Sequence, residues 1–533
     1  MAAPSRRSRF TAVLSVSIVT ASLLGLGPVV GAQGQETSDV QVEASSVQSL
    51  GSGYLQVDGV MSGNVIRDDG SPAQYRVPVT LVYPENTAQC DGDALVDVIN
   101  SVFYETFAFA GTQQDPFFPS LLPGARLLLG DDFLESRGYV YAHAQWNKLV
   151  IERQRQAGTL PDPTLAIDRG TDGYFILRDL SDFLRRPAEL FVGSVAPPCA
   201  VQDVVAFGGS QTGMLLRQFY FAGLNTALAS ASSFDDGNVF EGSLQFVPGG
   251  RCRSLTDDSP WFSYSFARCG GETPEAQGKV ITINAETDVQ MVNGWRARPG
   301  GEGNGGIDHY RLYEIGGASH IPTSFIPLKL VGLREEEAAE QNYAQMAPVI
   351  RAMVEHLREW IEAGSAPPPS VFLKGRVARL AAPLFSAASW GGDTRLAFVT
   401  TLGEDGNALG GVRLPHVRTT LPSGVRVRGP LGLYRGTECG NDPTDSTYIL
   451  SCGLSGDVNI YNMAGGTFTP YPQVDVRLCN GFYPTHQSYT DAITEAAEYA
   501  VAQRWILPEE ADSIVAGAEQ KALEFPGCVP GVS

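Results

Sequence analysis

Residues 208–213 read Gly-Gly-Ser-Gln-Thr-Gly and follow directly on the apolar run 203–207 (DVVAF). The β-branched residues of that run predict a buried strand, and the stretch 214–219 (MLLRQF) predicts a helix. A serine between strand and helix, flanked by small residues, is typical of a sharp turn that lifts its hydroxyl clear of the sheet. The N–H groups of the new helix then face any anion formed there. The stretch predicts a nucleophile elbow at Ser210; a glycine-rich loop that only turns the chain is the alternative.

One position departs from the general elbow pattern, which is G-x-S-x-G. Thr212 stands two residues after the serine, and the glycine follows one place later. A threonine is small enough to pass the edge of a sheet, so the elbow interpretation stands but depends on the rest of the site.

A secretory signal peptide is predicted over residues 1–32. Three of the first nine residues are arginine, residues 10–30 are apolar and small, and residues 30–32 (VGA) resemble a cleavage site. A membrane anchor is the alternative, but serines and threonines dilute the run and a polar stretch follows. We therefore expect a secreted protein with no integral membrane association. Residues 33–50 are polar and small, and we expect them to form a disordered lead-in.

Composition excludes some partners and suggests disulfides. The formal net charge of −20 argues against nucleic acid or an anionic membrane surface as a partner. Eight cysteines in an exported chain indicate disulfides, and none forms the C-x-x-C pair of a zinc site. No metal and no cofactor is predicted. The pairs closest in sequence, Cys252 with Cys269 and Cys439 with Cys452, are the expected bridges.

The order of elements predicts an α/β fold with a mostly parallel central sheet covered by helices on both faces. A helix is expected over 338–363, where Pro348 requires a kink or a fresh start. The core is expected over 51–369, a β- and loop-rich insertion over 370–480, and helices packing on the core over 481–533. The predicted strands are 53–60, 64–67, 74–83, 95–100, 139–144, 203–207, 226–230, 279–284 and 310–315.

An orienting acid is predicted after the strand 279–284. That strand runs into Ala-Glu-Thr-Asp at 285–288, which puts two carboxylates at the carboxyl end of the sheet, where ligands of parallel sheets bind. Asp288 is the first choice and Glu286 the fallback. A solvated acidic loop or a helix cap is the alternative.

A general base is predicted after the next strand, 310–315, where Gly-Gly-Ala-Ser leads to His320. The small residues let the loop fold back toward the serine. The chain order serine, acid, histidine matches that of enzymes with a nucleophile elbow. The N–H of Gln211 is the expected first oxyanion donor. The second is expected in the loop after 95–100, near Ser101 or Val102.

These residues resemble the secreted α/β-hydrolase-domain family whose nucleophile motif reads G-x-S-Q-[ST]-G. The likeness includes residues 208–213, 286–288 (ETD), 316–320 (GGASH), 405–415 (DGNALGGVRLP) and the terminal helices near 489–516. It implies an α/β-hydrolase fold and ester hydrolysis, on substrates that are mostly undefined.

Substrate contacts are predicted from three aromatic side chains. Trp261 and Phe262 lie in the long segment 231–278, which forms either a cap over the pocket or an insertion with its own small core. His143, near the end of the strand 139–144, is the third.

The sequence predicts an exported serine hydrolase acting on small-molecule or polymeric carboxylic esters through Ser210, His320 and Asp288. A peptidase or an acyltransferase would use the same residues. A binding protein on a hydrolase scaffold would keep the fold without needing the chemistry.

Overall fold

A computed structural model of the 533-residue chain shows how these elements are arranged. Strand and helix bounds, contacts and burial below refer to the residues that the structure describes: 40–67, 69–99, 124–229, 237–255, 277–291, 293–299, 308–318, 320, 346–379, 396–401, 408–418, 433–435, 457–462, 467–470 and 486–524. The predicted signal peptide lies outside them.

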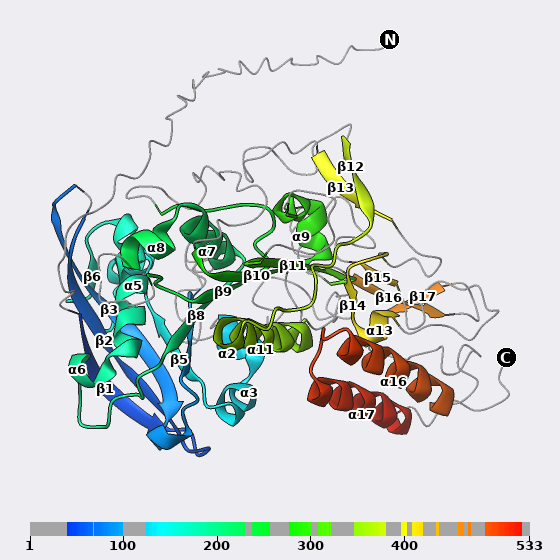
Figure 1. Cartoon of the computed structure of the whole chain (residues 1–533), viewed down its shortest axis with the longest axis horizontal. Helices are drawn as coiled ribbons and strands as arrows, with labels where there is room; N and C mark the ends of the chain where they lie inside the picture. The colour runs from blue at the N-terminus through cyan, green and yellow to red at the C-terminus, as the bar shows by residue number, and fades with distance from the viewer. Residues whose placement is uncertain are drawn as a thin grey trace, which may run out of the picture.

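A twelve-stranded mixed sheet forms the centre of the molecule, in the order β14-β11-β10-β9-β8-β4-β5-β3-β2-β1-β7, with β6 paired to β3 (Figure 1). Strands β4, β5, β8, β9, β10, β11 and β14 are parallel, and β3 joins β5 antiparallel. The parallel part confirms the predicted fold class. The strands are β1 (Gln41–Ser49), β2 (Tyr54–Ile66), β3 (Pro72–Pro84), β4 (Asp93–Asp97), β5 (Val140–Ala144), β6 (Ala166–Ile167), β7 (Phe191–Val192), β8 (Asp203–Gly209), β9 (Gly242–Phe246), β10 (Lys279–Ala285), β11 (Tyr310–Gly316) and β14 (Val412–Arg413).

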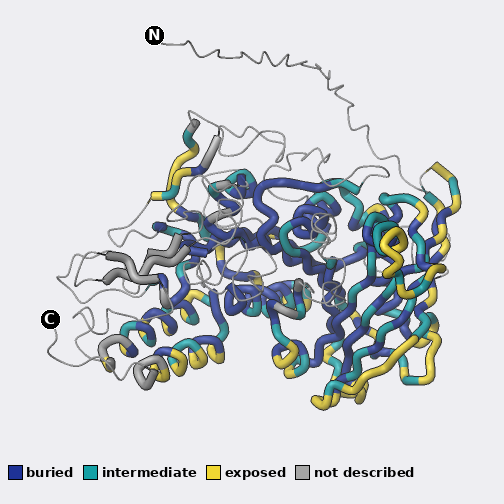
Figure 2. The backbone as a smooth tube through the Cα atoms, turned by 180° about the vertical axis from the view of Figure 1, so that it is seen from behind, coloured by how far each residue is buried: buried dark blue, intermediate teal, exposed yellow. Residues whose placement is uncertain are grey.

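Helices cover both faces of this sheet, and each face has its own hydrophobic core. One core contains residues of α2 (Gly124–Leu129), α3 (Asp131–Ser136) and α11 (Ala347–Ala363). The other contains residues of α4 (Lys148–Ala157), α5 (Gly173–Arg185), α7 (Gln211–Phe221) and α8 (Leu224–Ala229). The alternation of side chains along each strand divides them between the two cores, so the central strands are buried throughout (Figure 2).

Short elements complete the chain. They are the helical turns Thr87–Gln89, Gly170–Asp172 and Gly294–Ala297, the short helices α6 (Pro187–Leu190), α9 (Glu286–Met291) and α13 (Pro415–Arg418), the hairpin β12 (Gly375–Arg379) and β13 (Leu396–Thr400), and the three-stranded sheet β15 (Leu433–Arg435), β16 (Asp457–Asn462) and β17 (Thr467–Pro470).

Pro348 begins a helix rather than kinking one. Helix α11 starts at Ala347, so the proline lies in the first turn, where its missing N–H removes no intrahelical bond. Of the two alternatives for this proline, the fresh start is confirmed. The first residues of the predicted helix, 338–345, lie outside the described residues.

Two local predictions were wrong. Residues 41–49, placed in a disordered lead-in, form strand β1 along β2, because the long β2 leaves an edge whose backbone groups need partners. Residues 226–230, predicted as a strand, lie largely in helix α8. Leucine and alanine favour a helix there, and the buried Asn225 amide donates to the carbonyls of Phe240 and Gln277, which fixes α8 against the chain beside it.

The segment 231–278 is not a continuous cap. Its residues Gly242–Phe246 form β9, a central strand between β8 and β10, so this part of the cap prediction was wrong. The strand was missed because Ser243 and Gln245 are polar yet fully buried. The Thr282 hydroxyl on β10 donates to the Gln245 side-chain oxygen (3.1 Å), which satisfies that polar atom inside the sheet.

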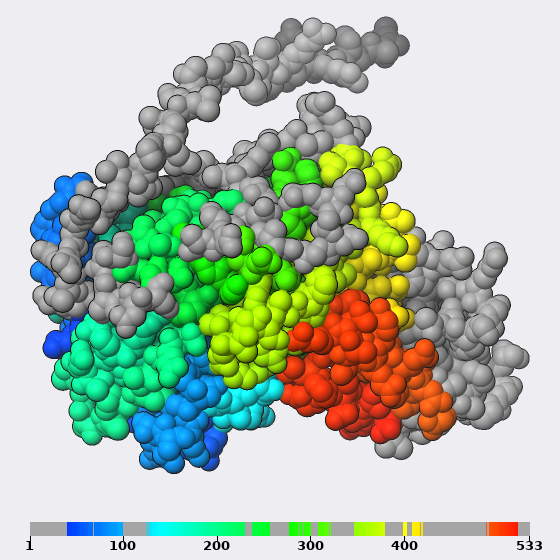
Figure 3. Space-filling view, viewed as in Figure 1, coloured from blue at the N-terminus to red at the C-terminus, as the bar shows by residue number. Residues whose placement is uncertain are grey.

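The C-terminal helices pack on the central unit. Helices α16 (His486–Ala502) and α17 (Pro508–Glu524) are found within 481–533, where helices were predicted. Figure 3 shows them at the surface beside α11. Arg351 of α11 pairs with Glu510 (2.6 Å), and His356 Nε2 lies 2.9 Å from the carbonyl of Arg504. The C-terminal region also adds β14 to the central sheet, next to β11.

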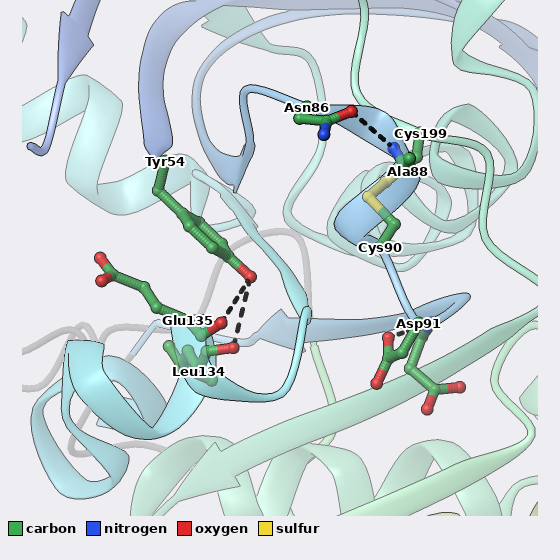
Figure 4. The surroundings of a disulfide bond; sticks show 9 residues. Tyr54, Asn86, Ala88, Cys90, Asp91, Leu134, Glu135 and Cys199 are labelled. Atoms are coloured by element: carbon green, nitrogen blue, oxygen red, sulfur yellow. Dashed lines mark hydrogen bonds between the residues drawn. A yellow bond between two sulfur atoms is a disulfide. The ribbon is translucent and has the colours of Figure 1, made fainter. Parts of the chain in front are cut away.

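A disulfide joins Cys90 to Cys199, in the segments that enter β4 and β8 (Figure 4). Neither expected pair predicted it, since the two cysteines are 109 residues apart in sequence. Cys252 is disulfide-bonded as well, but Cys269, Cys439 and Cys452 lie outside the described residues, so those two pairings stay predictions. Within the described part of the chain, no helix combines the length and the apolar character needed to cross a membrane.

Candidate active site

Ser210 occupies a strained turn between β8 and α7. Its φ is 55° and its ψ −113°, a combination that residues with a side chain rarely adopt. Its N–H donates to the carbonyl of Phe246 at the end of β9 (2.8 Å), and its own carbonyl accepts from Met214 N–H (2.9 Å). The turn therefore has the local geometry predicted for a nucleophile elbow.

Two glycines allow the close packing of this turn. A side chain on Gly208 would lie 2.7 Å from the carbonyl of Thr212, and one on Gly213 would lie 2.9 Å from the carbonyl of Phe246. Both distances are shorter than real contacts, so only glycine fits. The glycine that comes one place late in the motif is thus the one that lets α7 approach β9.

Thr212 contributes a hydroxyl to the turn. Its Oγ1 accepts from the N–H of Gly209 (3.0 Å) and lies at the same distance from the Gly209 carbonyl, to which it donates. Threonine is therefore more than a small residue tolerated at this position. Its departure from the general elbow pattern gave no indication of this role.

A chain of hydrogen bonds connects the three predicted residues. Ser210 Oγ lies 2.9 Å from His320 Nε2, and His320 Nδ1 lies 2.6 Å from Asp288 Oδ1. The other carboxylate oxygen of Asp288 accepts from the N–H of Ala285 (2.9 Å). Asp288 is fully buried and the His320 side chain is 10% exposed. Such an arrangement can orient an imidazole and move a proton between serine and histidine.

The fallback acid, Glu286, does not take this place. Its Oε2 accepts from the N–H of Gly317 (2.8 Å), in the turn that leads to His320. Burial raises the pKa of the Glu286 carboxyl to about 7, against hydrogen bonds that lower it. The structure thus places Asp288 at the imidazole and gives Glu286 different partners.

The predicted oxyanion donors are placed only in part. Gln211 is the first residue of α7 and is buried, so its N–H lies at the positive end of that helix. Ser101 and Val102 lie outside the described residues, as do the aromatic residues Trp261 and Phe262. The second donor and these two substrate contacts stay predictions.

His143 is partly buried and belongs to a polar group at the end of β5. Its Nδ1 lies 3.3 Å from the hydroxyl of Tyr141, which donates to Asp97 Oδ2 (2.9 Å). Burial lowers the pKa of His143 to about 4 and raises that of Asp97 to about 7, so the imidazole is neutral at physiological pH. The predicted substrate contact of His143 is not tested by these interactions.

One group of described carboxylates is close enough to hold a cation. Oxygens of Asp93, Asp203 and Glu362 lie within 4.8 Å of one another, at the opposite edge of the sheet from Ser210. Arg358 lies among them, 3.8 Å from Asp93 Oδ2 and 3.3 Å from Glu362 Oε1, and supplies a positive charge. The guanidinium makes this an ion-pair cluster.

Comparison with a family model agrees with the fold. Residues 130–516 match the model of a protein family described as an alpha/beta hydrolase domain. No curated protein matches the chain. Among solved structures, a CE15 glucuronoyl esterase from Teredinibacter turnerae is similar at 12% identity, with a TM-score of 0.21; the similarity covers 40% of this chain and about half (47%) of that one.

Proposed function

We infer that this chain, which belongs to the alpha/beta hydrolase domain family, is a serine hydrolase that cleaves carboxylic esters. The observation that carries the inference is the hydrogen-bonded chain from Ser210 Oγ through His320 to Asp288, built on a strained turn. Fold alone does not assign chemistry, so the proposal rests on these side chains.

The geometry suits acyl transfer in two steps. His320 Nε2 takes the proton of Ser210 while Oγ attacks the ester carbonyl, and Asp288 holds the Nδ1–H and supports the charge that forms. The Gln211 N–H stabilises the oxyanion. The imidazolium then protonates the leaving alcohol, and an acyl-enzyme remains. Water, deprotonated by His320, releases the acid and restores the serine.

Substitution of the nucleophile tests the proposal. Ser210→Ala should abolish turnover of a short p-nitrophenyl ester, with circular dichroism unchanged, and a fluorophosphonate should label Ser210 in the wild type, as read by peptide mass spectrometry. Ser136→Ala on α3 is the matched control, and it should keep both ester turnover and fluorophosphonate labelling of Ser210. Equal turnover in Ser210→Ala and the wild type would contradict the proposed mechanism.

The same residues serve related reactions, and further assays separate them. Faster cleavage of peptide p-nitroanilides than of esters would make the protein a peptidase, and a preference for added alcohols over water would make it an acyltransferase. Absence of both labelling and turnover would leave a binding protein on a hydrolase scaffold. We favour esters because an ester is the easier of the two bonds to cleave.

Export is the second part of the proposal. The apolar stretch after three arginines supports a signal peptide over 1–32, and the Cys90–Cys199 disulfide suits an oxidising compartment. Mass spectrometry of the protein recovered outside the cytoplasm should find a chain that begins at Gln33. Recovery of the full-length chain in the cytoplasm would contradict export.

A further inference from the structure

Two buried carboxylates at the start of α9 have different partners. Asp288 contacts the imidazole of His320, whereas Glu286, which is 4% exposed, binds backbone and side-chain donors around that site. The chemistry proposed above uses Asp288 and assigns nothing to Glu286. A buried carboxylate is costly unless it is hydrogen-bonded, so its partners indicate what it does.

The first partner of Glu286 belongs to the segment that carries His320. Glu286 Oε2 accepts from Gly317 N–H at 2.8 Å. Gly317 directly follows the end of β11 and has a φ of 76°, which glycine adopts without strain. The bond therefore holds the turn at which the chain leaves the sheet, three residues before His320.

The other partners of Glu286 come from α9 and from the C-terminal region. Glu286 Oε1 accepts from Gln290 Nε2 at 2.8 Å and from the Thr400 hydroxyl of β13 at 3.4 Å. Gln290 also donates to Thr400 (2.9 Å), which closes the group. Glu286 thus joins α9, the turn before His320 and the hairpin of β12 and β13. Arg413, beside Gly316 in the sheet, partly offsets the cost of its charge.

We propose that Glu286 is a positioning residue, whose side chain holds the Gly317 turn so that His320 stays within reach of Ser210. This inference rests on the proposed function of the same site. Glu286 acts through the backbone of the loop and not on the imidazole. The length of the Glu286 side chain, more than its charge, should therefore determine kcat.

A pair of substitutions separates the effect of side-chain length from that of charge. Glu286→Asp keeps the charge but is one methylene shorter, and it should lower kcat by about 10–100-fold with little change in KM, since a displacement near 1 Å at the reacting groups has that effect. Glu286→Gln keeps the length and an oxygen acceptor for Gly317 N–H, and it should keep kcat close to the wild-type value. Fluorophosphonate labelling of Ser210 should slow in the aspartate variant alone.

Glu355 of α11 offers the matched control, because it is an acid in an ion pair with Arg137 (2.7 Å) away from the site. Glu355→Asp and Glu355→Gln should change thermal stability at most, and leave kcat unchanged. A Glu286→Gln variant as impaired as Glu286→Asp would overturn the proposal, since charge would then decide. Wild-type kcat in Glu286→Asp would overturn it too.

A second readout does not depend on a substrate. The ¹H NMR resonance of the His320 Nδ1–H, which faces Asp288, should broaden or shift in Glu286→Asp and persist in Glu286→Gln. Persistence in both variants would overturn the positioning role. Absence of wild-type turnover and labelling would count against the proposed function instead, and the resonance would still show whether Glu286 places the imidazole.

Discussion

The parallel strands of the central sheet begin at one side, the amino edge, and end at the other, the carboxyl edge. Buried acids have different neighbours at these two edges. At the carboxyl edge, Asp288 and Glu286 are surrounded by N–H and hydroxyl donors, and each oxygen has a partner. At the amino edge, Asp93 and Asp203 lie side by side on β4 and β8 with Glu362 close by, and Arg358 is the positive charge among them. Burial, followed by the neighbouring carboxylates of Asp91, Glu362 and Asp203, raises the pKa of Asp93 to about 8.

The Cys90–Cys199 disulfide lies near the amino edge. Cys90 and Cys199 precede β4 and β8, the strands that carry Asp93 and Asp203, so the disulfide secures the amino edge where like charges meet. The carboxyl edge carries the strained Ser210 turn and the loop to His320. Under the proposed function, the carboxyl edge carries the chemistry, and changes at the amino edge should affect stability alone.

The largest expected effect is at the carboxyl edge. Asp288→Asn should lower kcat for a p-nitrophenyl ester by about 10⁴-fold, because the amide cannot hold the imidazole in the required tautomer. Asp93→Asn, the same change at the amino edge, should leave kcat unchanged. Steady-state kinetics gives kcat for the two variants, and equal values would contradict the expected difference between the edges.

Removing the disulfide should act on stability alone. The double variant Cys90→Ser and Cys199→Ser should lose about 2–5 kcal/mol of free energy of unfolding, because the bridge closes a long loop in the unfolded chain. Urea denaturation measures the loss. A variant that remains folded but no longer hydrolyses a p-nitrophenyl ester that the wild type hydrolyses would show that this edge also supports the proposed chemistry.

Thr212 sharpens the account of the carboxyl edge. Thr212→Val removes the hydroxyl that bonds both backbone groups of Gly209, and should cost about 1–3 kcal/mol of free energy of unfolding. Thr212→Ser keeps the hydroxyl and should stay near the wild type in denaturant titrations. Equal stability of the valine and serine variants would mean that size alone matters at this position.

The smallest effect concerns pH at the amino edge. The folded-state pKa of Asp93 exceeds its unfolded value, so the folded protein binds the extra proton between about pH 4 and pH 8. Stability should therefore fall as pH rises through this window. The loss should be on the order of 1–2 kcal/mol, because partly exposed neighbours are screened by solvent. In Asp93→Asn this slope should flatten in unfolding curves taken at several pH values, and an unchanged slope would assign it to other groups.

Much of the fold was predictable because its signals are local. The β-branched residues of β8 and β10 and the apolar and aromatic residues of β11 indicate buried strands, and the small residues around Ser210 and before His320 indicate sharp turns. The misses have physical causes. Strand β9 carries buried polar residues, of which Gln245 accepts a hydrogen bond from Thr282 of β10, and β1 pairs with β2 and with β7, which is distant in sequence. Helix α8 depends on Asn225, which reaches carbonyls far along the chain.

For the site, neighbours along the chain were enough to predict the nucleophile, acid and base, their order and the strand that each one follows, because these features are local. The folded arrangement was needed to show that Asp288 and not Glu286 contacts His320, that Thr400 hydrogen-bonds Glu286, and that Cys90 pairs with Cys199. Each of these depends on distances between segments far apart in sequence, and such distances exist only once the sheet has formed.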